Sequence, residues 1–323
     1  MKNKKVLKLL VLFAVTYILH LTSCICLYAG PGTTGASFLK IGLGARAAGM
    51  GEAFVAVADD VSAIYWNPAG LSFLTNREAT FVHNSWLQGI NYEYLGYAQK
   101  IGNLGSFGID IAYLGMEPIE RTKEDGAGNY AGKEGSADAT DLTVGLAYAR
   151  EIGGLSLGTT LKVFQERLAQ YTSTGFGVDI GALKKFEGVD KLTVGVNIQN
   201  IGSPIAFIDT TKTSPLPLNI KLGASCKALE DNLTLALDLN YLPYENKFDF
   251  RFGGEYWCNK ILAVRLGYRT NSASDIDVFS GFTAGFGLRW EGCGIDYAFV
   301  PYGNLGQSHR FSIVTSFGSS QEK

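Results

Sequence analysis

The feature that most constrains the fold is an alternation of apolar with polar or small side chains, which recurs from about residue 80 to the end of the chain. In residues 282–290, for example, Phe282, Phe286 and Trp290 fall on one face and Arg289 falls on the other. Successive side chains of a β-strand point to opposite faces, so this period of two predicts strands with one apolar face each. The same split recurs in residues 155–163, 233–240, 248–253 and 294–299.

The number and length of these segments narrow the choice between two all-β architectures. Fourteen candidate strands begin near Thr80, Tyr92, Leu104, Asp141, Leu155, Thr174, Leu192, Leu218, Asn232, Phe248, Ile261, Phe282, Cys293 and Ser308. A tilted strand needs about 9 to 11 residues to cross a bilayer, and globular strands average about 5 to 6. The segments are close to the longer value, which favours a membrane barrel. A soluble β-sandwich buries similar alternating faces, so the connections must decide.

The connections alternate in length. Short ones follow the even-numbered strands, at residues 101–103, 151–154, 228–231, 259–260 and 291–292. Long ones follow odd-numbered strands, at residues 114–140, 201–217, 271–281 and 301–307, with exceptions at 87–91 and 185–191. Outer-membrane barrels have short periplasmic turns and long external loops, whereas a sandwich has no reason to sort its loops in this way. We therefore predict a 14-stranded antiparallel transmembrane β-barrel over residues 77–318, followed by a tail at 319–323.

Composition agrees with a barrel. Glycine accounts for 40 of the 323 residues, and charged residues for 18%. Glycine costs about 1 kcal/mol inside a helix, but on the inward faces of a barrel it leaves room for lumen contents. The net charge of −2 gives no indication of nucleic-acid binding. Cys226, Cys258 and Cys293 lack CxxC spacing, so we expect neither a disulfide framework nor a metal or cofactor site.

Residues 1–29 have the layout of a secretory signal peptide. Lysines near the N-terminus precede an apolar run from Leu9 to about Leu21, and cleavage after Ala29 is one option. The string ending at Cys24 also resembles a bacterial lipobox, which would leave that cysteine acylated. Together with a barrel, an export signal predicts a bacterial outer-membrane location.

Residues 30–76 have a different pattern. Glycine and alanine are frequent between Phe38 and Ala58, and a short helical run follows through Trp66. Asp59 or Asp60 can cap that helix and Pro68 ends it. The predicted hatch motif comprises Asp59, Asp60, Asn67, Pro68, Ala69 and Gly70. We predict that this segment is a hatch, containing a short helix, that plugs the lumen.

Residues 35–70 read GASFLKIGLGARAAGMGEAFVAVADDVSAIYWNPAG. This stretch resembles the opening of PorV/PorQ (UPF0164-like) outer-membrane proteins, and more distantly the FadL long-chain fatty-acid transporters with their Asn-Pro-Ala element. Later stretches are also similar to PorV/PorQ proteins, namely residues 83–87, 148–150, 200–202, 216–217 and 265–268. The resemblance implies a fourteen-stranded barrel with an N-terminal hatch.

Two functions follow from this resemblance. FadL-like members pass hydrophobic compounds inward from the cell exterior, so we expect hatch-gated passage or binding of such compounds. PorV-like members serve type IX secretion, in which they accept cargo proteins and hand them on for surface attachment. A continuous apolar tunnel, or a lateral gap between strands, would favour the first function, and a closed lumen with a broad external apolar patch would favour the second.

Charged residues mark the inward faces of the predicted strands, because a charge facing lipid costs about 2 to 4 kcal/mol at the midplane. The expected lumen-facing charges are Lys162, Asp179, Lys221, Asp238, Arg251, Glu255, Arg265, Arg269, Arg289 and Asp296. Mutual ion pairing and anchoring of the hatch, or a solute path, would each explain them.

A second group of candidates is apolar and lies in the two long loops. Leu114, Met116, Ile205, Phe207, Ile208 and Leu216 are candidates for an external hydrophobic contact surface. Packing of the two loops on each other is the alternative.

An enzyme is not expected. His83 and His309 lie in the first and last predicted strands, with Ser85 and Ser308 nearby in sequence, but such pairs arise easily by chance. The expected partners are outer-membrane lipid and either hydrophobic small molecules or secreted cargo proteins, around a monomeric barrel.

Overall fold

The computed structural model describes residues 33–186, 191–207, 211–270 and 278–319. Within them, fourteen antiparallel strands close into a barrel. The sheet closes because β1 (Asn76–Ser85) pairs with β2 (Asn91–Ile101) on one side and with β16 (Gln307–Ser319) on the other. The remaining wall strands are β3 (Gly105–Gly115), β6 (Ala139–Ile152), β7 (Leu155–Leu168), β8 (Tyr171–Phe186), β9 (Leu192–Gly202), β10 (Asn219–Ala228), β11 (Leu233–Leu242), β12 (Lys247–Trp257), β13 (Leu262–Arg269), β14 (Phe282–Trp290) and β15 (Cys293–Pro301). The predicted fold class is confirmed.

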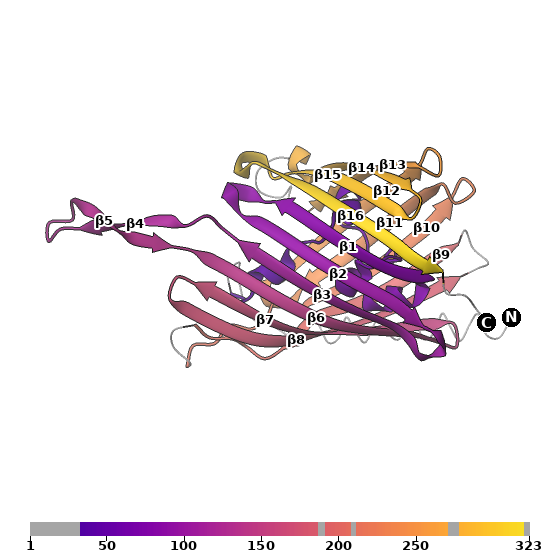
Figure 1. Cartoon of the computed structure of the whole chain (residues 1–323), viewed down its shortest axis with the longest axis horizontal. Helices are drawn as coiled ribbons and strands as arrows, with labels where there is room; N and C mark the ends of the chain where they lie inside the picture. The colour runs from indigo at the N-terminus through magenta and orange to yellow at the C-terminus, as the bar shows by residue number, and fades with distance from the viewer. Residues whose placement is uncertain (1–32, 187–190, 208–210, 271–277, 320–323) are drawn as a thin grey trace.

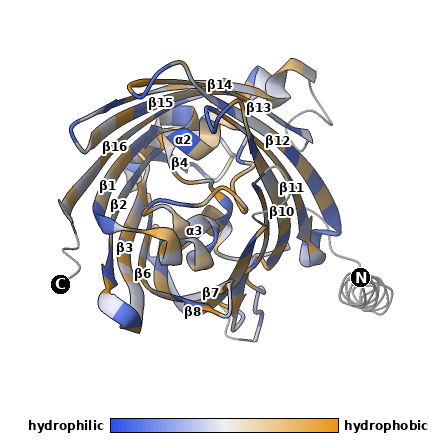
Figure 2. Cartoon of the chain, turned by 90° about the vertical axis from the view of Figure 1, so that its right-hand side faces the viewer, coloured by the Kyte–Doolittle hydropathy of each residue, from blue (hydrophilic) through white to orange (hydrophobic). Residues whose placement is uncertain are grey.

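The wall has an apolar outer face. Leu161, Phe252, Phe286 and Ile295 are all exposed, while their neighbours in sequence point inward. This is the alternation on which the strand prediction rested, and Figure 2 shows it as apolar and polar bands across the strands. The interior of the barrel therefore contains the core of the molecule.

The two rims of the barrel differ. The short-turn rim carries the tight connections that follow β2, β6, β10, β12 and β14, and the long-loop rim carries the connections at the other end. A two-stranded hairpin, β4 (Ile119–Glu124) with β5 (Tyr130–Ala137), projects far beyond the long-loop rim (Figure 1). The sequence predicted a loop here because these strands have no buried apolar face, and both are almost wholly exposed.

Residues 33–75, here called the lumenal segment, run through the inside of the barrel (Figure 2). The segment contains η1 (Ser37–Lys40), α2 (Ala45–Gly49), α3 (Ala63–Trp66) and η2 (Pro68–Phe73). Further short helices occupy the connections: η3 (Leu87–Gly89), η4 (Gly102–Leu104), η5 (Pro243–Glu245), η7 (Val278–Gly281) and η8 (Gly303–Leu305).

No helix within the described ranges is long and apolar enough to span a membrane. The predicted signal peptide and Cys24 lie outside those ranges. The wall begins at Asn76 and ends at Ser319, each one residue beyond the predicted barrel bounds.

Candidate functional site

The lumenal segment and the wall make their closest contacts along a ring of inward-facing glycines, here called the glycine belt. Its members are Gly108, Gly158, Gly181, Gly195, Gly223, Gly253, Gly267 and Gly285. At each one, an added Cβ would lie 3.1 Å or less from an atom of the lumenal segment. All eight lie three to five residues from the short-turn end of their strands. The segment is therefore packed directly against wall backbone in this half of the lumen.

Hydrogen bonds reinforce the same contact. The Asp238 carboxylate of β11 accepts from the backbone N–H groups of Phe54 and Val55, at 2.7 and 2.9 Å. Asn197 of β9 donates to the Trp66 carbonyl at 2.7 Å. Ser225 of β10 donates to the Ala56 carbonyl at 2.9 Å. Inward polar side chains thus satisfy backbone groups that the short, irregular segment cannot pair internally.

Asn67 is a central residue of the predicted hatch motif and is fully buried. Its amide nitrogen donates to the Val55 carbonyl at 3.0 Å and to wall carbonyls of Ala182 and Val196 at 3.4 and 3.3 Å. Its side-chain oxygen accepts from Ala69 N–H, which caps η2 with Pro68 at its first position. One side chain therefore shapes the segment and attaches it to the wall.

The other motif residues have separate roles. Asp60 accepts from the N–H of Ser62, which is the N-cap residue of α3 in place of either aspartate, and both Asp59 and Asp60 pair with Arg46. Gly70 packs on the Ala58 carbonyl, where a Cβ would have no room.

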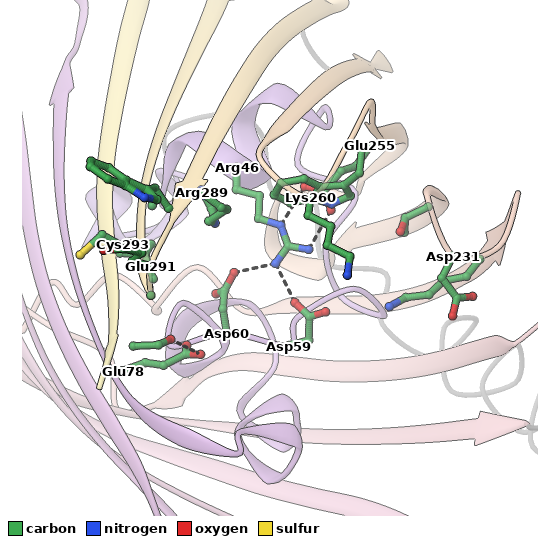
Figure 3. Close-up of a pocket in the computed structure, with 18 residues that line it drawn as sticks. Arg46, Asp59, Asp60, Glu78, Asp231, Glu255, Lys260, Arg289, Glu291 and Cys293 are labelled. Atoms are coloured by element: carbon green, nitrogen blue, oxygen red, sulfur yellow. Dashed lines mark hydrogen bonds and ion pairs between the residues drawn. The ribbon is translucent and has the colours of Figure 1, made fainter. Parts of the chain in front are cut away.

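Arg46 of α2 ties the lumenal segment to the wall near the short-turn rim. Its guanidinium lies 2.6 Å from Asp59, 2.8 Å from Asp60 and 2.9 Å from Glu255 of β12. Figure 3 shows Arg46 between these carboxylates, beside a polar pocket of about 560 Å³ that opens among the short turns. Burial alone would lower the pKa of Arg46, but Asp59, Glu255 and Asp60 raise it well above its usual value. The residue is therefore a permanent cation.

The pairing continues into the wall. Arg265 contacts Glu255 at 2.7 Å and Asp296 at 2.8 Å, and Asp296 also pairs with Arg289 at 2.9 Å. One chain of ion pairs thus leads from the segment into the wall, through Arg46, Glu255 of β12, Arg265 of β13, Asp296 of β15 and Arg289 of β14.

A second charged cluster surrounds Glu52 of the segment. Arg251, Arg269 and Arg310 approach its carboxylate at 2.8, 3.3 and 3.1 Å. Burial alone would raise the pKa of Glu52, but the three arginines lower it to about 2. Sequence reasoning missed Arg46, Glu52 and Arg310. A signal was present in the first two, which are isolated charges within a Gly- and Ala-rich stretch.

All ten expected lumen-facing charges point inward. Lys162 pairs with Asp179 at 2.8 Å and donates to Asn200 at 2.6 Å, while buried Lys221 lies 4.8 Å from the Trp66 ring. The structure assembles most of the ten into the clusters described above. Among the described residues, no group of three or more His, Cys, Asp or Glu side chains could hold a metal ion.

The long-loop half of the lumen is filled by apolar side chains. Phe38 and Leu39 of η1 pack in a buried cluster with Tyr92, Tyr94 and Phe164. Rings of Phe38 and Phe164 meet edge to face with centroids 6.1 Å apart. We call this cluster the outer apolar pocket; η1 occupies it.

The structure contradicts the predicted external contact surface for three of its six residues. Ile205 and Leu216 are buried in the outer apolar pocket because the loop after β9 folds inward onto the lumenal segment, where Gly35 N–H donates to the Pro215 carbonyl. Leu114 is buried there because it lies on the inward face of β3. Met116 is half-buried and Phe207 is exposed, and Ile208 lies outside the described residues.

The histidines form wall contacts. His83 Nδ1 lies 2.7 Å from Glu93 Oε1, and His309 Nδ1 lies 2.8 Å from Tyr297 Oη. Ser308 is buried and donates to Asn84 at 2.6 Å. Both histidines and Ser308 thus form hydrogen bonds between neighbouring wall strands.

Comparison with known proteins gives two kinds of match. A family model described as "Type IX secretion system protein PorV" matches residues 31–243, more than half of the chain. A UPF0164 protein of Treponema pallidum (strain Nichols) is 29% identical over 183 residues, which cover 51% of this chain and 43% of that protein. The chain thus spans less than half of that relative's length.

Solved structures match the fold over most of the chain. The toluene transporter TodX of Pseudomonas putida has a TM-score of 0.60 at 14% identity, covering 85% of this chain and 97% of TodX. A FadL homologue of Pseudomonas aeruginosa has a TM-score of 0.56 at 14% identity, covering 86% and 99%. The families and folds of this type are in general not enzymes. The chain belongs to the PorV family and has the FadL-like barrel fold of an outer-membrane protein.

Proposed function

We propose that this protein binds hydrophobic compounds at the external mouth of its barrel and passes them inward when the lumenal segment moves. The supporting observation is the outer apolar pocket, which the protein fills with Phe38 and Leu39 from its own chain. The long-loop rim faces the cell exterior, since short turns of outer-membrane barrels are periplasmic. The pocket is therefore placed to receive a ligand from outside.

The helix that fills this pocket is short, and its polar ties to the barrel include an ion pair of Lys40 with Glu245 at 2.6 Å and a hydrogen bond from Ala36 N–H to Glu166 at 3.0 Å. η1 has four residues, and its N-cap Ala36 has a left-handed backbone (φ 49°) without a side-chain cap. Phe38 and Leu39 are held in the pocket by apolar contacts. An apolar ligand that displaces them would therefore bury most of the same pocket surface. The glycine belt holds the other half of the segment, which separates the binding step from the opening of the lumen.

A disulfide lock tests the displacement step. A Cβ on Gly35 would lie 3.4 Å from the Cβ of Ser214, close to the about 3.5 to 4.5 Å typical of disulfides. The Gly35→Cys/Ser214→Cys variant, with Cys226, Cys258 and Cys293 changed to Ser, is placed in nanodiscs and titrated with n-nonane by calorimetry. We expect binding in the reduced form and loss of at least tenfold in affinity when oxidised. Equal binding in both forms would contradict the proposal.

Passage requires its own measurement. Proteoliposomes that carry the same variant should accumulate labelled nonane faster when the lock is reduced than when it is oxidised. The reduced form is also the control for any shift of Ile205, whose side chain lies next to the new Cβ.

A PorV-type role in secretion is the second candidate, and the projecting hairpin favours it. Residues 116–138 carry six acidic and three basic side chains, with Ile119 and Tyr130 exposed. Two-stranded hairpins are marginally stable alone, and their open edges pair readily with other chains. Replacing residues 118–137 by a Gly-Gly turn should reduce capture of secreted cargo proteins at the cell surface without changing nonane binding. Unchanged cargo capture would remove this candidate.

A further inference from the structure

One small cavity separates the lumenal segment from the wall, and it lies beside the outer apolar pocket. Its volume is about 30 Å³. Phe38, Leu39 and Tyr65 of the segment form one side. The other side is formed by wall residues Tyr92, Tyr94, Asp110, Ala112, Thr143, Lys162 and Asp179. Withdrawal of η1 would join this cavity to the space that Phe38 and Leu39 vacate.

The wall side of the cavity presents polar atoms that lack partners. Among the described residues, Tyr94 Oη, Asp110 Oδ1, Thr143 Oγ1 and Asp179 Oδ2 are buried and have no well-formed hydrogen bond, and the Tyr94 hydroxyl lies next to the Asp110 carboxylate. The side chains of Tyr94, Thr143 and Asp179 are 2%, 6% and 1% exposed. A buried polar atom without a partner costs about 1 to 3 kcal/mol, so such a group of four points to a missing ligand or to water.

The unpartnered atoms are of a particular kind. The two carboxylate oxygens only accept hydrogen bonds, while the two hydroxyls accept or donate. The one ammonium group lining the cavity, on Lys162, is already engaged by Asp179 and Asn200. A ligand group that donates hydrogen bonds would therefore satisfy this set better than one that only accepts them.

The charge count points the same way. Asp110 and Asp179 contribute two carboxylates against the single Lys162. A third carboxylate brought in by a ligand would be buried next to like charge with no cation left to pair with it, which is unfavourable at low dielectric. A neutral hydroxyl or an ammonium group would face no such penalty.

From this geometry we infer that the cavity receives the polar end of an amphiphile, and that this end is a hydrogen-bond donor such as an amine or an alcohol and not a carboxylate. The alkyl or aryl part would occupy the outer apolar pocket in place of Phe38 and Leu39. This inference rests on the proposed function and specifies the chemical class of ligand that the site selects.

The test is a matched series of nine-carbon compounds: n-nonane, 1-nonanol, nonylamine and nonanoate. Each is titrated by calorimetry at pH 7 into the full-length barrel in nanodiscs, with empty nanodiscs as the blank for partition into lipid. We expect nonylamine to bind at least tenfold more tightly than nonanoate, with 1-nonanol next and nonane weaker than both donors. If nonanoate binds as tightly as nonylamine, the inference is overturned while the proposed function stands. If none of the four binds, both are overturned.

Two variants connect the preference to this cavity. Asp110→Asn removes one negative charge and should bring the affinities of nonylamine and nonanoate close to equal. Thr143→Val should weaken 1-nonanol about fivefold and leave nonane unchanged. Asp138→Asn makes the same change of charge at an exposed site beyond the rim and should leave the series unaltered. Heat-modifiable migration on gels confirms that each variant is folded, and an unchanged amine preference in folded Asp110→Asn would overturn the inference.

Discussion

The two halves of the lumen hold the same segment in different ways. Toward the short-turn rim, glycine backbone, hydrogen bonds and ion pairs fix the segment, beside a polar pocket of about 560 Å³ that opens among the short turns. Toward the long-loop rim, aromatic side chains surround η1 next to a cavity of about 30 Å³. At the glycine belt itself, where the segment lies directly on wall backbone, little room is left for another arrangement, because close-packed interiors have few voids. Apolar side chains in a pocket are exchangeable for a ligand. Under the proposed function, this difference places sealing in one half of the lumen and binding in the other.

The largest expected effect is from Arg46→Ala, which would break the sealed half. The change removes the cation that Asp59, Asp60 and Glu255 share. Breaking a buried pair costs about 3 to 5 kcal/mol, and because Glu255 keeps Arg265 and Asp59 is partly exposed, we expect the lower end of that range. We expect increased leakage of small solutes from liposomes and a lower midpoint of heat modification. As a control, Arg121→Ala, on the exposed hairpin, should change neither. An intact seal in Arg46→Ala would mean that the segment is held without this link.

The Asn67→Ala/Pro68→Ala variant should also raise leakage. It leaves the carbonyls of Val55, Ala182 and Val196 without the donor they share, at a cost of about 1 to 3 kcal/mol. Single-channel conductance is the measurement, and Asn103→Ala, in an exposed short turn, is the control. No change in conductance would count against a hatch in this half of the lumen.

Neighbouring glycines offer a sharper comparison. A Cβ on Gly253 would lie 2.9 Å from Met50 Cβ, whereas the nearest atom to a Cβ on Gly254 is 3.7 Å away. Overpacking typically costs about 1 to 3 kcal/mol, so Gly253→Ala should lower barrel stability in urea and Gly254→Ala should not. Equal effects of the two changes would show that the segment yields easily and that the belt is not tight.

Lowering the pH should have the smallest effect on leakage. The pKa of Glu52 lies at about 2, below its value of about 4.3 in an unfolded chain. Its contribution to stability is therefore complete above the unfolded value and is lost as the pH falls from there toward 2. We expect unchanged leakage from pH 7 to 5 and a rise below pH 4. Glu52→Gln should lack that rise, and a transition near pH 6 would point to another group.

The barrel itself was predictable because each strand repeats one simple signal. Leu157, Phe252 and Ile295 face lipid on strands far apart in sequence, and each carries the same alternation. For the same reason, the predicted strand starts lie within four residues of the observed ones, the largest difference being Thr80 against Asn76. The β4–β5 hairpin was missed because neither of its strands buries a face, so no period distinguishes them from a loop.

The interior was less predictable because it depends on pairs that lie far apart in sequence. Alternation indicated that Glu255 and Arg265 point inward, but not that Arg46, 209 residues before Glu255, lies between them and Asp59. Likewise Ile205 and Leu216 read as exposed loop residues, and only the inward fold of their loop onto Gly35 buries them. No pattern among residues close in sequence indicates such contacts.

The glycine belt also limits how this protein can be recombined with its relatives. A wall that lacks Cβ atoms at eight positions fits only one backbone path of the lumenal segment, which includes the close approach of Gly51 to Gly267. Segment and wall are therefore not interchangeable modules, and a chimera that receives its N-terminal segment from another barrel should assemble only if the matching glycines are transferred with it.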